Sequence, residues 1–552
     1  MEQFLCRSSA LTKLPCYMAC VSLPRARSKG ETVTSSNISR PRFSKNRPTA
    51  MRQDKWGLVK HISTAALTSA LLLGFIARSR TAQADEFIVA HSGADTAFSQ
   101  QKLDGSGVTV AIVDSGINAV HWDLAQSGSK ISRVKTSVNF VPNSTVISDL
   151  CGHGTHVAGI VAGNGASSTG NTFYRTFYGI ARNANLVNVR VLDDKGAGTV
   201  SSVIAGIQWC IANKSTYGIR VINLSLGHEA GESYKTDPLC QAVEAAWKAG
   251  IVVVCASGNT GRLTPGTTAG ASNEGYGTAY GSIQSPANDP YVITVGAMKQ
   301  DLSTAPSGSY SGNRTYDRIG TYSSRGPTRL DLVLKPDIVA PGNRVIGLCA
   351  DKSYLDNYDG NTNDIAHAEY MINGDAVLSR TYFRLSGSSM AAPVVAGAAA
   401  LMLQKYPSLT PDTVKCRLML SADKWADPAG NGDPCTYGAG YVNIPAALAS
   451  TTAPRQAALS PTLSQDASGN VYINLDTSVW GTDVNGQRAL WGATGVSDLR
   501  AVWGTRAVWG TNTNLLSASR AIWGQSVWSD RAVWGTSTSA VDLTSTAVQG
   551  EK

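Results

Sequence analysis

The sequence predicts an α/β fold of three layers, in which a mostly parallel central sheet carries helices on both faces. Between about residues 95 and 450, short runs of β-branched and other apolar residues alternate with Ala-rich stretches of helical spacing. Alternation of this kind is typical of parallel strands joined by right-handed helical crossovers. The runs are almost wholly apolar, as expected for strands that are buried on both faces.

The expected elements follow one another in order along this region. The predicted strands are Val108–Asp114, Leu186–Leu192, Val221–Leu226, Ile251–Ala256 and Tyr291–Ala297. The predicted helices are Val157–Gly163, Val200–Asn213, Leu239–Ala249 and Met390–Tyr406. Two long polar stretches, residues 260–285 and 350–383, are predicted to be surface loops.

The formal net charge of +9 belongs to the N-terminal part of the chain. Residues 1–84 hold 14 of the 48 basic side chains and only 3 of the 39 acidic ones, so 34 basic and 36 acidic residues follow position 84. The rest of the chain is therefore almost neutral. This distribution excludes a large polyanion-binding surface, and we expect no nucleic-acid partner.

Residues 51–84 are predicted to be a signal peptide. A basic segment precedes an apolar stretch of 16 residues, 62–77, and Ala82 and Ala84 fit an Ala-x-Ala cleavage signal. The stretch is shorter than the roughly 20 residues of a membrane-spanning helix, although a retained anchor is the alternative. We therefore expect a secreted protein. Residues 1–50 then either precede the true start of translation or form an extended leader.

Seven of the ten cysteines follow the predicted cleavage point. Export permits disulfides, and Cys416 and Cys435, which bracket a short polar loop, are the best candidates for a bridge. Cys255 lies in an apolar run, where a buried thiol is expected instead. An odd number leaves at least one thiol free or paired between molecules.

The composition changes after about residue 450, and residues 451–552 form a repeat tail. The unit Arg-Ala-x-Trp-Gly recurs at Arg488–Gly492, Arg500–Gly504, Arg506–Gly510, Arg520–Gly524 and Arg531–Gly535. The irregular spacing excludes a simple solenoid, and short strands ended by Gly turns are one expectation. The tail is expected to contact a glycan or cell surface, to pack on the preceding domain, or to be loosely ordered.

Three polar side chains occupy strand ends or helix starts, in the order Asp, His, Ser. Asp114 ends the first predicted strand, His153 lies in Gly-His-Gly-Thr-His-Val-Ala-Gly, and Ser389 precedes the last predicted helix. A serine hydroxyl needs a base, the base needs a carboxylate, and a helix N-terminus offers N–H donors to an oxyanion. The order is one of those known for a catalytic triad. His156 is expected to be structural.

The three segments resemble the triad motifs of the subtilisin-like serine peptidase family (subtilases, peptidase family S8). The resemblance covers roughly residues 95–450, within a domain that we place at 85–450. It implies a secreted serine endopeptidase that cleaves proteins or peptides through an acyl-enzyme. His153 would act as base and then as acid, Asp114 would orient it, and Ser389 would attack the scissile carbonyl. The chemistry requires no cofactor, and we expect a monomer.

The oxyanion and specificity segments of the family also have counterparts. Asn259, in Ala-Ser-Gly-Asn, matches the residue whose amide donates to the oxyanion, and the backbone N–H of Ser389 is the second donor. Substrate-binding segments are implied at Ser225, Leu226 and Gly227 and at Ala256, Ser257 and Gly258. Residues 322–327 and 335–342 match scaffold motifs without a catalytic part.

Several positions depart from the family pattern. Ser388 stands where Thr is usual, and His228 replaces a second Gly at the pocket rim. Cys151, two residues before His153, is expected to be structural. Only 29 residues separate the predicted cleavage point from Asp114, too few for the inhibitory pro-domain that many relatives carry. The domain is expected to fold unaided or with help from the C-terminal repeats.

A structural calcium ion is a further implication of the resemblance. Asp123, in His-Trp-Asp-Leu, matches a position that often ligates calcium in this family. The companion loop, residues 163–178, contains no carboxylate. Carbonyl and Asn oxygens would therefore have to supply most of the about 6–8 ligands.

Two other functions stay open on the residues alone. A surface-binding protein would use the Trp/Arg repeats and keep the peptidase fold as a scaffold. Loss of a triad residue or of Asn259 would favour it, and all four are present. A peptide ligase or cyclase would form the same acyl-enzyme and transfer it to an amine, which the motifs do not distinguish from water.

Overall fold

The computed structural model describes residues 83–84, 86–263, 277–300, 314–358, 363–427, 430, 432–465, 471–474, 531–533 and 551. The chain divides into two compact units, residues 1–78 and 79–552, and all described residues belong to the second. Almost all of the predicted signal peptide and most of the repeat tail lie outside the described residues.

The central sheet has eight strands, and seven of them are parallel. Its strands are β2 (Thr109–Asp114), β3 (Val134–Asn139), β5 (Asn185–Arg190), β7 (Ile219–Leu224), β8 (Val252–Ala256), β9 (Ile293–Gln300), β10 (Asp317–Ile319) and β11 (Ile338–Pro341). The order is β10-β9-β8-β7-β2-β5-β3, β11 pairs with β9, and β10 is antiparallel. Because β2 and β7 end at the same edge, polar residues after both strands meet there.

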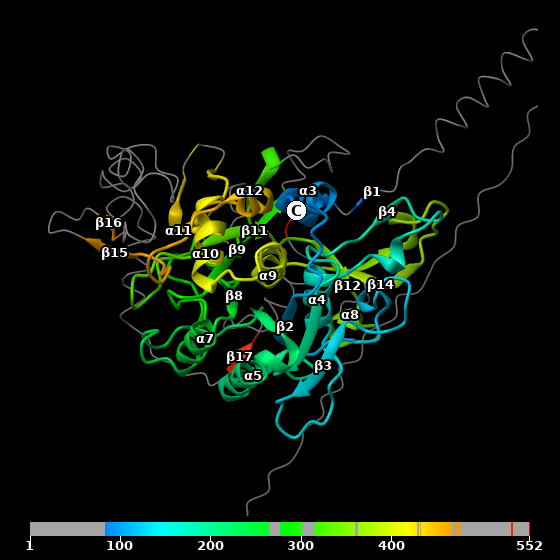
Figure 1. Ribbon diagram of the computed structural model, residues 1–552, viewed down its shortest axis with the longest axis horizontal. Coiled ribbons are helices and arrows are strands. Elements are labelled where there is room, and N and C mark those ends of the chain that lie inside the picture. The colour runs from blue at the N-terminus through cyan, green and yellow to red at the C-terminus, as the bar shows by residue number, and fades with distance from the viewer. Residues whose placement is uncertain are drawn as a thin grey trace, which may run out of the picture. The chain divides into compact units, whose positions relative to one another are not determined.

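Helices cover both faces of this sheet (Figure 1). The principal ones are α4 (His153–Ala162), α5 (Val200–Ala212), α7 (Pro238–Lys248) and α9 (Ser388–Lys405). α9 packs on β7, β8 and β9 and against α4, whereas α5 and α7 pack on one another and on β2 and β8. The first sixteen residues of α9 are buried, as expected for a helix enclosed by other elements. The predicted three-layer α/β fold is confirmed.

The remaining elements surround this core. They are β1 (Gln83–Ala84), α2 (Glu86–Ser92), α3 (Ala94–Gln101), β4 (Arg175–Thr176), β6 (Ala197–Thr199), α6 (Lys214–Tyr217), β12 (Val345–Leu348), α8 (Tyr354–Asn357), β13 (Asp364–Ala366), β14 (Leu378–Leu385), α10 (Pro411–Leu420), α11 (Pro434–Tyr437), α12 (Ile444–Ala449), β15 (Thr462–Gln465), β16 (Val471–Asn474) and β17 (Arg531–Val533). No helix in the described part combines the length and hydropathy that crossing a bilayer requires.

All five predicted strands and all four predicted helices are present, with ends shifted by a few residues. The prediction of a loop over residues 350–383 is wrong. This stretch contains α8, β13 and most of β14, and the last two join β12 in an antiparallel sheet. β14 mixes exposed and half-exposed residues with buried ones, and polar residues interrupt it, so it lacks a continuous apolar run. Most of the other predicted loop, residues 264–276, lies outside the described residues.

The predicted disulfide between Cys416 and Cys435 is also wrong. Both thiols are buried and unbonded, one on α10 and the other on α11. The same holds for Cys151, Cys210, Cys240, Cys255 and Cys349. A short spacing along the chain says nothing about the directions of two side chains, and these two point into the apolar core.

Glu551, whose side chain is buried, attaches its segment to the α/β domain. Its carboxylate forms ion pairs with Arg262 and, at 3.0 Å, with Lys299. It accepts a hydrogen bond of 2.9 Å from the backbone N–H of Thr321. The Asn343 amide donates to the Glu551 carbonyl at 2.8 Å and accepts from its N–H at 2.9 Å. One repeat also contributes backbone, because β17 pairs with β6.

We expect Glu551→Gln to destabilise the protein. The substitution removes the carboxylate that Arg262 and Lys299 share, a loss bounded by about 3–5 kcal/mol for a buried ion pair. The bound is an upper one, because the side chains of Arg262 and Lys299 are 15% and 10% exposed to water. The measurement is the free energy of unfolding of the Ser389→Ala protein, which cannot digest itself, with and without Glu551→Gln.

Glu229→Gln is the matched control. Glu229 also pairs with an arginine, Arg329, but its side chain is 70% exposed. A surface pair of this kind contributes about 0–1 kcal/mol. Equal losses in the two variants would contradict the attachment of this segment through Glu551.

Candidate active site

Asp114 and His153 form a buried pair at the carboxyl edge of the sheet. Asp114 is the last residue of β2, and His153 is the first residue of α4. His153 Nδ1 lies 2.8 Å from Asp114 Oδ1, which also accepts a 2.7 Å hydrogen bond from the N–H of Ser115. The contact favours the tautomer with the proton on Nδ1, so the lone pair that a base needs lies on Nε2.

The carboxylate of Asp149 holds the start of α4 in place. Its Oδ1 accepts hydrogen bonds from the N–H of Gly152 at 2.8 Å and the hydroxyl of Ser115 at 2.9 Å. Its Oδ2 accepts from the N–H and the hydroxyl of Thr155 at 2.8 and 2.7 Å. Ser115 Oγ in turn accepts from the N–H of Gly154 at 3.0 Å. Asp149 and Ser115 therefore tie the aspartate strand to the histidine helix.

Sequence reasoning missed Asp149. The available signal was an acidic residue shortly before a predicted helix start, which is typical of a helix cap. Its function is to position His153, because it binds the backbone on both sides of that residue. Burial raises the pKa of Asp149, and the hydrogen bonds from Gly152 and Thr155 oppose that effect.

Ser389 is the second residue of α9, and it forms hydrogen bonds with Ser225, which directly follows β7. Its hydroxyl donates to the carbonyl of Ser225 at 3.0 Å, and the Ser225 hydroxyl donates to the carbonyl of Ser389 at 2.8 Å. Gly387 precedes this turn with a φ of 149°, a conformation that side chains disfavour. Since α9 packs against α4, the serine and histidine helices share one interface.

Asn259 is held by the residue before the serine. Its Oδ1 accepts hydrogen bonds from the N–H and the hydroxyl of Ser388, at 2.8 and 3.0 Å. These bonds define the orientation of the amide, so Nδ2 is the donor on the other side. A side chain at Gly387 would lie 3.1 Å from this Nδ2, so the glycine keeps the space beside the donor open. Ser388 retains the hydroxyl of the usual Thr and uses it here.

The two predicted specificity segments are buried and lie on either side of Gln284. A Cβ at Gly227 would lie 3.0 Å from Gln284 Oε1, and a Cβ at Gly258 would lie 2.8 Å from its Cγ. Residues 225–227 follow β7, and residues 256–258 follow or end β8. His228, at the predicted rim, exchanges backbone hydrogen bonds of 3.0 and 2.9 Å with Ser285. The glutamine side chain therefore lies against both segments.

The carboxylate of Asp123 accepts hydrogen bonds from neighbouring groups of the protein. Oδ1 accepts from the N–H of Ser167 at 2.7 Å, and Oδ2 accepts from the Tyr382 hydroxyl at 2.6 Å. The Arg133 guanidinium binds the Asp123 carbonyl at 2.8 Å. These neighbours satisfy the carboxylate and bring a positive charge, so they do not fit a calcium ion. Calcium at Asp123 stays a prediction from the resemblance alone.

His156 is buried against the antiparallel sheet rather than beside Asp114. Its Nε2 lies 3.0 Å from the carbonyl of Val345, and its ring meets Phe383 edge to face at 5.1 Å. Burial and the neighbouring His153 lower the pKa of His156 to about 3. Cys151, likewise buried, has a thiol whose pKa burial raises. Both residues have structural surroundings.

The pKa of His156 predicts acid destabilisation. An unfolded histidine has a pKa of about 6.5. Between pH 6.5 and 3, the unfolded state therefore binds a proton at this histidine that the folded state does not bind. Stability present above pH 6.5 is lost as the pH falls towards 3, by about 1.4 kcal/mol per unit. We expect a loss of about 3 kcal/mol between pH 6.5 and 4, measured by urea unfolding of the Ser389→Ala protein.

His156→Gln keeps a donor for the Val345 carbonyl and cannot be protonated. Its stability should be lower at pH 7 but should fall less steeply towards pH 4. His367→Gln is the control, because His367 is a partly exposed histidine paired with Asp375 at 3.0 Å. An unchanged slope in His156→Gln would show that other groups cause the acid sensitivity.

A buried Asp–His pair at the carboxyl edge of a parallel sheet, and a serine at the start of a neighbouring helix, are the parts of a serine peptidase site. On this fold, the arrangement is typical of serine-type peptidases.

Comparison with known proteins gives the family. A profile of the subtilase family matches residues 105–440, and the chain belongs to that family. Serine protease AprX of Bacillus subtilis (strain 168) is 40% identical over 348 residues, which are 62% of this chain and 66% of that protein. Subtilisin DY of Bacillus licheniformis is 34% identical over 347 residues, 63% of this chain and 93% of that protein. The chain thus spans just under two thirds of AprX.

A solved structure is also similar. It is described as a cold adapted subtilisin-like serine proteinase, is 30% identical and covers 62% of this chain and 90% of its own, with a TM-score of 0.40. That score is too low to add to the fold derived above.

Proposed function

We propose that the protein is a secreted serine endopeptidase that hydrolyses peptide bonds through an acyl-enzyme on Ser389. The observation that carries this proposal is the 2.8 Å contact between His153 Nδ1 and Asp114 Oδ1. With Nδ1 donating to the carboxylate, Nε2 takes the proton of the Ser389 hydroxyl as the oxygen attacks the scissile carbonyl. Asp114 stabilises the imidazolium, and the proton then passes to the leaving amine.

The oxyanion of the tetrahedral intermediate is assigned to two donors. One is Asn259 Nδ2, whose orientation follows from the two hydrogen bonds of Ser388 to Oδ1. The other is the backbone N–H of Ser389, in the first turn of α9. Donors fixed in advance stabilise the charge without reorganising, which is the main advantage of such a site. Water then attacks the acyl-enzyme with His153 as base.

Purified residues 85–552 test the reaction class. We expect cleavage of casein and covalent labelling by a fluorophosphonate, both abolished in Ser389→Ala. Product mass spectrometry in the presence of an amine nucleophile distinguishes hydrolysis from ligation or cyclisation. A wild-type protein that neither cleaves nor labels would contradict the proposal and favour a surface-binding role for the repeats. Secretion is supported by residues 51–84 alone, and fusing them to a reporter tests it.

Gln284 is predicted to limit the side chain that the enzyme accepts on the acyl side of the scissile bond. Its side chain lies against both segments assigned to specificity, so small side chains should be preferred. In Gln284→Ala, we expect kcat/KM for a phenylalanine substrate to rise relative to an alanine substrate by about 10-fold. The measurement uses a pair of fluorogenic peptides that differ only at this residue.

Gln241→Ala is the control, because this glutamine is exposed on α7. The ratio should not change there. An unchanged ratio in Gln284→Ala, with the enzyme still active, would place the pocket elsewhere.

A further inference from the structure

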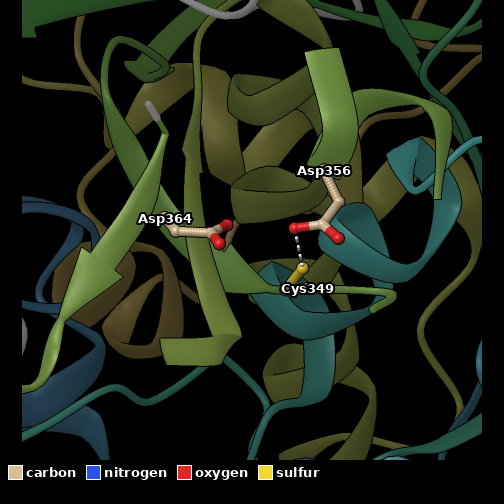
Figure 2. A group of neighbouring side chains, drawn as sticks. All are labelled: Cys349, Asp356 and Asp364. Atoms are coloured by element: carbon tan, nitrogen blue, oxygen red, sulfur yellow. Dashed lines mark hydrogen bonds between the residues drawn. The ribbon is translucent and has the colours of Figure 1, made fainter. Parts of the chain in front are cut away.

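Cys349, Asp356 and Asp364 form a buried cluster outside the active site (Figure 2). One ligand atom from each, a sulfur and two carboxylate oxygens, lies within 4.8 Å of the others. Cys349 Sγ is 3.4 Å from Asp356 Oδ1, and in Figure 2 the carboxylate of Asp364 points towards that of Asp356. The three residues are at most 4% exposed.

Three different elements hold these side chains. Cys349 directly follows β12, and its N–H donates to the carbonyl of Thr381 on β14 at 2.8 Å. Asp356 lies on α8, and its Oδ2 accepts from the N–H of Lys352 at 2.6 Å. Asp364 begins β13, which pairs with β14. The cluster is therefore arranged by the fold itself and does not depend on one loop.

Among the residues that the structure describes, Asp364 lacks the partners that a buried carboxylate needs. Neither of its oxygens accepts a hydrogen bond from these residues. Arg380 contacts Asp356 at 3.6 Å and Asp351 at 3.2 Å, and its side chain is 51% exposed. A buried, unpaired carboxylate is destabilising unless a cation or a proton neutralises it.

We propose that Cys349, Asp356 and Asp364 bind one divalent transition-metal cation of the zinc type. A thiolate with two carboxylates suits borderline-soft Zn²⁺, whereas Ca²⁺ and Mg²⁺ take oxygen ligands. Three protein ligands leave one position of a tetrahedral site for water. Binding releases the thiol proton of Cys349 to solvent, and the cation replaces it.

The cation has a structural function, because the cluster lies against the segment that precedes His153. The N–H of Tyr354 donates to the carbonyl of Leu150 at 2.8 Å, and the N–H of Leu355 donates to that of Cys151 at 2.9 Å. Any side chain at Gly152 would collide with Ser353. A cation bound to Asp356 stabilises α8 and, through these contacts, the entry into α4.

The test uses the full-length Ser389→Ala protein, so that metal content is measured without autolysis and independently of peptidase activity. After incubation with Zn²⁺ and gel filtration, elemental analysis should give one zinc per chain. Co²⁺ in its place should give a thiolate-to-cobalt charge-transfer absorption, and its loss in Cys349→Ser would assign the thiolate to Cys349. We expect Asp364→Asn to weaken binding about 10- to 100-fold and the bound metal to raise Tm.

Asp375→Asn is the matched control, since Asp375 is a 65% exposed aspartate between β13 and β14. It should leave zinc content unchanged. Circular dichroism shows whether Asp364→Asn folds, and Cys349→Ser is the second variant if it does not. A folded Ser389→Ala protein that retains no zinc and becomes more stable in Asp364→Asn would overturn the proposal, because the two carboxyl groups would then share a proton. Unchanged zinc affinity in both ligand variants would overturn it as well.

Discussion

Ser389→Ala is expected to lower kcat/KM on a fluorogenic peptide by about 10⁶-fold, the magnitude known for the corresponding serine of subtilisin itself. The substitution removes the atom that we propose forms the acyl-enzyme and leaves the proposed oxyanion donors in place. The fold should survive, because the side chain contributes one hydrogen bond, to the carbonyl of Ser225 at 3.0 Å. KM is therefore expected to change little, and Tm to shift by a few degrees.

Ser99→Ala is the control for this experiment, because Ser99 is exposed on α3. It should retain full activity and full labelling by a fluorophosphonate. Activity of Ser389→Ala within 100-fold of the parent would assign the nucleophile to another residue.

Asn259→Ala is the prediction with the second largest effect. We expect kcat to fall by about 10²–10³-fold with KM nearly unchanged, again the range known for subtilisin. The proposed donor would act on charge that develops only in the transition state, so ground-state binding would not need it. The measurement determines kcat and KM separately for the Asn259 variant and for the Ser388 variants.

Variants of Ser388 separate the orientation of the Asn259 amide from its donation of a hydrogen bond. Ser388→Ala removes the 3.0 Å hydrogen bond to Asn259 Oδ1 but keeps the 2.8 Å bond from its N–H, so we expect a smaller fall in kcat, about 10-fold. Ser388→Thr should restore it. In the double variant with Asn259→Ala, the Ser388 change should add only what its contacts with the Gly258 carbonyl at 3.0 Å and the Gly258 N–H at 3.1 Å contribute, because the amide is gone. Additive losses would mean that Ser388 acts on something other than the amide.

The elements that the sequence predicted best are those with one simple environment. Strands β2, β7 and β8 are buried on both faces and read as continuous apolar runs, and α9 is buried along most of its length. β14 was missed because polar residues interrupt it and its buried residues do not form a continuous run. Its burial depends on partner strands that local composition does not reveal.

The site residues also differ in how well the sequence predicted them. Asp114, His153, Ser389 and Asn259 stand in motifs whose residue types are set by chemistry, and three of them lie at strand ends or helix starts that local pattern can place. Asp149 and Gln284 carry no such motif. Each matters through groups far along the chain or on another segment, such as Ser115 for Asp149 and Gly227 for Gln284.

The three-layer class and the positions and order of the Asp, His, Ser and Asn motifs follow from the amino-acid sequence alone. How the histidine helix is held, how the Asn259 amide is oriented and which side chain lies against both specificity segments depend on the packed fold. The packing also leaves Cys416 and Cys435 unbonded and brings Cys349 to two aspartates. All of these differences have the same cause. Backbone periodicity and residue chemistry are local, whereas hydrogen-bond partners, burial and ligand sets arise where distant segments meet.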